Sequence, residues 1–129
     1  MSYEEYSASF TQPLAVPEYL PENYKRHETV YVSTHPQSGE LMLVEQLWYN
    51  AVDEVFFELK QQFFNFYPID YSCKRLPDYL VLDGELPFLG RYYLTQGKSV
   101  GDVGVIMHMR VTNYYHAEFE EIFDAVVIP

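Results

Sequence analysis

The sequence predicts a single α+β domain in which an antiparallel sheet packs against one long amphipathic helix. Three observations lead to this fold class: the chain has 129 residues, 48% of them are hydrophobic, and the hydrophobic pattern changes between the strand period and the helix period. This composition is sufficient for a core, so we expect a folded chain. The single domain, 1–129, is expected to comprise an arm, residues 1–28, and a compact α+β body, residues 29–129.

The arm is expected to be extended. Pro13, Pro17 and Pro21 interrupt any helical or strand period, because proline lacks an amide hydrogen and favours an extended conformation in the residue before it. The arm also carries many apolar and aromatic side chains. We therefore expect it to dock on the body rather than to remain loose.

A β-hairpin is predicted where the body begins. Residues 29–33 are β-branched and alternating, residues 35–39 have turn composition, and residues 41–44 can return as the partner strand.

The long amphipathic helix is predicted over residues 46–66. Apolar residues recur there at four-residue steps, and Pro68 follows as a helix terminator. The resulting stripe consists of Leu47, Ala51, Val55, Leu59 and Phe63. In this arrangement Leu59 is expected to be fully buried between the helix and the sheet.

Three further strands are predicted after the helix. Residues 79–82 lead into Asp83-Gly84, a hairpin signal, and residues 91–95 form a short strand before a turn at residues 96–99. Residues 103–112 alternate most regularly, which predicts a central antiparallel strand.

A short helix is predicted near the C-terminus, within residues 114–125. Its apolar residues share one helical face and its acidic residues share the other, although a strand is also compatible with this segment.

The sequence contains little that indicates an enzyme. It has no glycine-rich phosphate loop and no nucleophile elbow. Cys73 is the single cysteine, and such a residue is more often a small buried hydrophobe than a nucleophile. His108, His116 and Glu118 could converge on a metal, but no HxxxH or HExxH spacing supports this. We therefore expect no catalytic residues, no metal and no cofactor.

The charge balance restricts the class of partner. Only 8 residues are basic and 19 are acidic, which gives a net charge of −11. Binding to free nucleic acid or to an anionic membrane requires the opposite balance. The N-terminus is acidic where a signal peptide is basic, and no apolar run is long enough to cross a bilayer, so we expect a cytoplasmic protein.

The acids and tyrosines together predict a binding protein. Lys60 is the only lysine or arginine between Arg26 and Lys74, and many of the 13 tyrosines stand beside acids. Tyrosine is enriched in protein interfaces. We expect an acidic, non-enzymatic inhibitor, a monomer or homodimer, that presents carboxylates and tyrosines to the basic groove of a nuclease or another nucleic-acid-binding protein. Small acidic DNA mimics, immunity proteins and anti-restriction or anti-CRISPR inhibitors have this general composition. The predicted partner-binding residues are Asp53, Glu54, Glu58, Glu118, Glu120, Glu121, Asp124, Tyr114 and Tyr115.

Two other functions stay open. The aromatic residues could line a pocket between the helix and the sheet, in a small-ligand binder or an enzyme. They could instead bury the contact face of a homo-oligomeric assembly subunit. Acids that line a concave pocket would favour catalysis, whereas acids on a convex exterior would favour a decoy.

Overall fold

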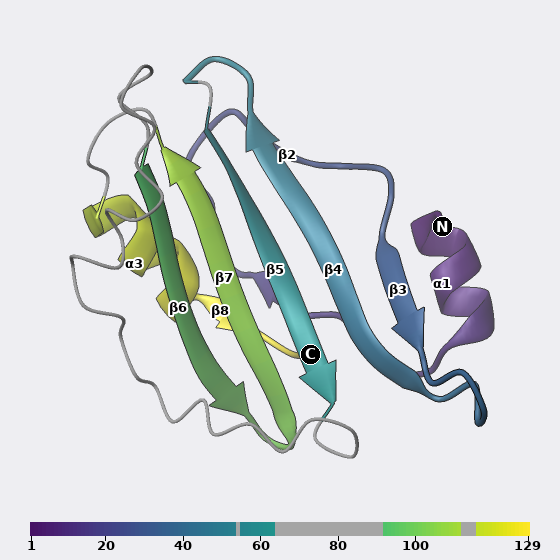
Figure 1. Ribbon diagram of the computed structural model, residues 1–129. Helices are drawn as coiled ribbons and strands as arrows, with labels where there is room; N and C mark the ends of the chain where they lie inside the picture. Colours follow the sequence, from purple (N-terminus) through teal and green to yellow (C-terminus); the bar gives the residue numbers. More distant parts are fainter. Residues whose placement is uncertain (54, 64–91, 112–115) are drawn as a thin grey trace.

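The computed structural model describes residues 1–53, 55–63, 92–111 and 116–129. In these residues the chain forms a large antiparallel sheet with two short helices (Figure 1). The sheet has six strands in the order β2-β4-β5-β7-β6, with β3 paired to β4 beside β2. The strands are β2 (Tyr24–Arg26), β3 (Tyr31–Thr34), β4 (Leu41–Asn50), β5 (Val55–Phe63), β6 (Tyr92–Val100) and β7 (Val103–Val111).

One face of this sheet is covered. Helix α3 (His116–Asp124) and a small two-stranded sheet, β1 (Val16–Pro17) with β8 (Val126–Val127), lie behind the large sheet in Figure 1. Helix α1 (Tyr3–Ser9) lies beside β3 at the opposite side of the molecule from α3. The covered side, which we call the core face, contains most of the buried apolar residues.

The predicted long helix over residues 46–66 is wrong. Within this range, residues 46–53 and 55–63 form the second half of β4, a turn and β5. A step of four residues is also two full periods of a strand, so Val55, Leu59 and Phe63 share one strand face as readily as one helical face. The described residues therefore form mainly β-structure. The predicted fold class is wrong, because it required one long amphipathic helix packed on the sheet.

The turn between β4 and β5 explains why the chain reverses here. The Oδ1 atom of Asn50 accepts hydrogen bonds from the backbone N–H groups of Val52 and Asp53, both at 3.1 Å, and its amide nitrogen donates to Asp53 at 2.9 Å. An asparagine that binds the backbone two and three residues ahead stabilises a turn in place of a helix. On either side of this turn, Trp48 of β4 stacks on Phe57 of β5, with ring centroids 5.3 Å apart.

Other sequence-based elements have mixed outcomes. The first hairpin is present as β3 and β4, and the regular strand over residues 103–112 is present as β7 between β5 and β6. The turn expected at residues 96–99 is wrong, because β6 continues to Val100 and the chain turns at Gly101, where φ is +62°. The strand at 79–82 lies outside the described residues.

The C-terminal helix and the N-terminal arm also differ in outcome. Within residues 114–125, α3 spans His116–Asp124. The arm is not extended throughout, because Ser2 and Glu5 form a capping box that begins α1. This serine and glutamate, three positions apart, are a helix-start signal that the proline content obscured.

Two buried glutamines attach the arm to the sheet. Gln61 accepts from the Ala15 amide at 2.7 Å and donates to the Pro13 carbonyl at 3.1 Å. Gln46 donates to the Ala15 carbonyl at 2.9 Å. The irregular backbone thus has buried hydrogen-bond partners, and Ala15 joins the main core.

The main core lies between the sheet and α3. Its sheet side contains Phe57, Leu59 and Met107, and its helix side contains Phe119, Ile122 and Phe123. Leu59 is completely buried, as expected, although it belongs to the sheet and not to a helix.

Candidate protein-binding surface

Asp53 and Glu118, one residue from each acidic segment of the sequence, lie close enough in space for their charges to interact. Asp53 lies in the exposed β4–β5 turn, whereas Glu118, Glu121 and Asp124 lie on α3. The helix packs on the sheet through its buried apolar residues, so its acidic residues are directed away from the core. Glu121 and Asp124 are exposed, and Glu118 is half-buried.

The pKa of Glu118 shows that these carboxylates interact. Partial burial raises the pKa of Glu118, and the negative charges of Asp53 and Glu121 raise it further. All three causes disfavour the ionised form of Glu118. A negative field is therefore concentrated here by residues from two elements that are distant in the sequence.

Glu18 and Tyr19 extend this surface. The pairing of β1 with β8 places Glu18 beside the end of α3, where its N–H donates to the Ala125 carbonyl at 2.9 Å. Tyr19 is 46% exposed. Together with Glu121 and Asp124 it lines an open hollow of about 450 Å³. We call Glu18, Asp53, Glu118, Glu121, Asp124 and Tyr19 the acidic patch.

Two of the acids that α3 contributes to the patch, Glu121 and Asp124, do not serve the stability of this helix, whereas Glu118 lies in its first turn. Glu121 and Asp124 lie toward the C-terminal end of the helix, where the helix dipole disfavours negative charge. Lys98 of β6 supplies a compensating cation, because its ammonium group donates to the Phe123 carbonyl at 2.6 Å and lies 4.7 Å from the centre of the Phe123 ring. This contact fixes the end of the helix that carries the patch.

The structure separates the other predicted partner-binding residues. Glu58 belongs to β5 and points away from the core face, beside His108 of β7, so it is not on one surface with Asp53. Glu120 is half-buried on α3 and makes other interactions. Glu54, Tyr114 and Tyr115 lie outside the described residues. Tyr19 was not among the predicted residues, although it follows Glu18 directly in the sequence.

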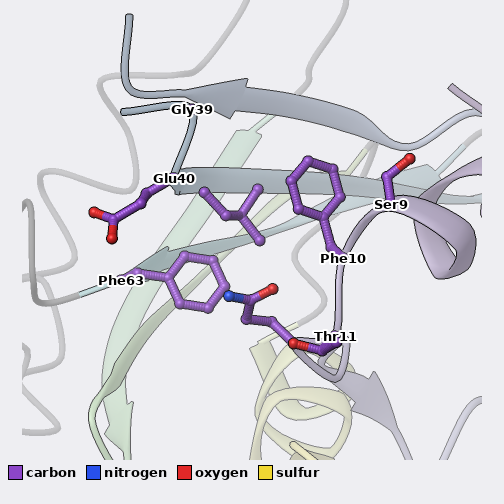
Figure 2. A pocket seen from close by; sticks show the side chains of 8 residues that line it. Ser9, Phe10, Thr11, Gly39, Glu40 and Phe63 are labelled. Carbon is purple, nitrogen blue, oxygen red and sulfur yellow. The ribbon is translucent and has the colours of Figure 1, made fainter. Parts of the chain in front are cut away.

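The described residues also contain a shallow pocket beside the arm, of about 330 Å³. Figure 2 shows the rings of Phe10 and Phe63 on two sides of it, with the Glu40 carboxylate directed away from both rings. The other lining residues are Ser9, Thr11, Gln12, Gly39 and Leu41. This lining has no cysteine or histidine that could act as a nucleophile or a base.

The structure does not support the alternative of an aromatic pocket between the long helix and the sheet. That helix is absent from residues 46–53 and 55–63, and the space between α3 and the sheet is filled by buried side chains. Within the described ranges, no group of three histidine, cysteine, aspartate or glutamate residues is placed to hold a metal ion.

Comparisons with known proteins do not assign the chain to a family. No family model, no curated protein and no solved structure matches it. Among the helices of the described residues, none is both long enough and apolar enough to span a membrane.

Proposed function

We propose that this protein is an acidic, non-enzymatic inhibitor that docks its acidic patch on the basic groove of a nuclease or another nucleic-acid-binding protein. The observation that supports the proposal most directly is the convergence of Asp53 with the acids of α3. Carboxylates that repel one another destabilise the free protein, and a cationic partner would offset that repulsion. The arrangement of these carboxylates therefore favours binding of a cationic partner, although it does not stabilise the isolated protein.

The geometry of α3 fits a phosphate-binding groove. Glu118, Glu121 and Asp124 follow one another at three-residue steps, which corresponds to about 4.5 Å of axial rise for each step. Phosphates on one DNA strand advance by about 3.4 Å of axis for each nucleotide. The row of carboxylates thus repeats on the same scale as the phosphates.

Tyr19 gives the patch an apolar component. An exposed tyrosine adds rigid contact area with a polar tip, and it lies beside the acids at the open hollow. The wall of a groove on a protein partner would contact this ring, whereas a small counterion would not. The exposed ring therefore favours a protein partner. We also propose a cytoplasmic location, which fits the single cysteine of the chain.

The proposal can be tested by capture from a native cell extract. Immobilised wild-type protein is compared with the double variant Glu118→Lys and Glu121→Lys at about 50 and 200 mM salt. We expect a nucleic-acid-binding protein to be captured at the lower salt, less of it at the higher salt, and none by the variant.

A matched control is provided by Glu28→Lys with Glu40→Lys. Both acids are exposed, lie outside the patch, and change the net charge by the same amount. Capture should persist with this control. Equal capture by both double variants, or capture that does not depend on salt, would contradict the proposal.

A further inference from the structure

A second hollow lies on the face of the sheet opposite α3, where the edge of the sheet is interrupted. β2 pairs with Trp48–Asn50 of β4, and β3 pairs with its Leu41–Glu45 segment, so neither strand pairs alongside Leu47. The backbone N–H of His27 donates to the Leu47 carbonyl at 2.8 Å within this interruption. The hollow lies beside this interruption, where Leu47 has no partner residue in β2 or β3.

The hollow has a volume of about 280 Å³ and combines apolar and acidic walls. Register places Tyr31 directly opposite Glu45, and Leu47 directly opposite Glu58. Glu45, Leu47 and Glu58 alternate with buried residues, so their side chains point away from the core face. Tyr31 is 54% exposed, which leaves its ring available for contact.

The charges around the hollow leave it negative. Lys60 lies 3.7 Å from Glu45 and offsets one carboxylate. Glu58 faces His108 across the β5–β7 pair. Burial lowers the pKa of His108, and the Lys60 charge acts in the same direction while Glu58 opposes both. This direction favours the neutral form of His108, and the two carboxylates of Glu45 and Glu58 outnumber the Lys60 ammonium by one charge.

We infer that this hollow binds an arginine side chain of a partner polypeptide. The guanidinium group stacks on the Tyr31 ring, and its N–H groups donate to the Glu45 and Glu58 carboxylates. The methylene stem lies along Leu47.

This inference does not depend on the proposed function. The hollow lies on the opposite face of the sheet from α3, and none of its lining residues belongs to the acidic patch. A negative result for the hollow would therefore leave the proposed function of the acidic patch unaffected, and a negative result for the acidic patch would leave the inference about the hollow unaffected.

The test uses the blocked tripeptide acetyl-Gly-Arg-Gly-amide and its citrulline analogue, which has nearly the same shape without the charge. Backbone amide spectra of the full chain are recorded by NMR during each titration. We expect saturable shifts at Tyr31, Glu45, Leu47 and Glu58 with the arginine peptide, and no saturable shifts with the citrulline peptide. The lysine peptide should bind more weakly, because it cannot stack a planar group on the ring.

Two variants and one control locate the binding site. Glu58→Gln should weaken binding about ten-fold, as expected for loss of a charge-assisted hydrogen bond. Tyr31→Ser should weaken it as well, whereas Glu40→Gln, an exposed acid outside the hollow, should leave it unchanged. The inference is overturned by equal affinity for arginine and citrulline, by shifts confined to the acidic patch, or by unchanged binding to Glu58→Gln. Sedimentation showing that a second copy of the chain occupies this face and excludes the peptide would also overturn it.

Discussion

Asp53 and Glu118 come from opposite halves of the chain, yet the charge of Asp53 helps to raise the pKa of Glu118. One residue lies in a turn between two strands, and the other lies on the helix that covers those strands. Their interaction joins two acidic segments into one surface, and it has a measurable consequence for stability.

The Glu118 carboxyl should make stability fall as the pH rises. Because its pKa is raised above the ordinary value of 4.5, Glu118 holds its proton more tightly in the folded protein than in the unfolded chain. The free energy of unfolding therefore decreases as the pH rises from about 4.5 through the higher folded value. The effect is small, since Glu118 is partly exposed and water screens its charge.

The variant Glu118→Gln cannot ionise at this position, so it lacks the decrease in the free energy of unfolding that Glu118 causes as the pH rises. Its stability relative to wild type should increase between about pH 4 and pH 7 in urea denaturation experiments. Glu40→Gln, which changes an exposed acid outside the patch, should show no such trend. A relative stability of Glu118→Gln that decreases over the same range would exclude the carboxylate interaction.

The buried amide of Gln61 should be essential for attaching the arm. Gln61→Leu leaves the Ala15 amide and the Pro13 carbonyl without this partner, and the loss at the buried Ala15 amide costs about 1–3 kcal/mol. We expect lower stability in urea and faster hydrogen exchange at Ala15. Gln37→Leu, in the exposed turn of the first hairpin, serves as the control. Slow exchange at Ala15 in Gln61→Leu would show that other contacts hold the arm.

Leu59 should contribute strongly to the core. Leu59→Ala removes a completely buried side chain and should lower the free energy of unfolding by about 2–5 kcal/mol. The adjacent variant Lys60→Ala, on the other face of the same strand, should cost less than about 1 kcal/mol. Chemical denaturation of both variants checks the strand alternation, and similar losses for the two would contradict it.

The strand periodicity of residues 103–109 was predictable because large apolar residues recur at every second position, from Val103 to Met109. Val105, Met107 and Met109 are all buried on the core face, as their spacing implies. The pattern across residues 46–63 was not decisive, because four-residue spacing satisfies both strand and helix periods. The turn at Asn50 separates two strands whose buried positions have opposite parity, so Leu47 of the predicted stripe lies on the other face of the sheet from Val55 and Leu59.

The candidate site was predictable only in part. The acidic segments could be found from charge alone, but their convergence depends on how α3 packs across the sheet, which the local sequence does not specify. Placing Glu58 on a helix also assigned it to the wrong surface. Tyr19 required the pairing of β1 with β8, a contact between segments near the two ends of the chain.

The most direct measurement of the central claim is displacement of nucleic acid from the captured partner. A fluorescent DNA duplex is bound to that partner, and its anisotropy is followed while this protein is added. The wild type should release the duplex, and Glu118→Lys with Glu121→Lys should not, because the acidic patch and the phosphates occupy the same basic groove. A duplex that stays bound while the wild-type protein also binds the partner would contradict the claim.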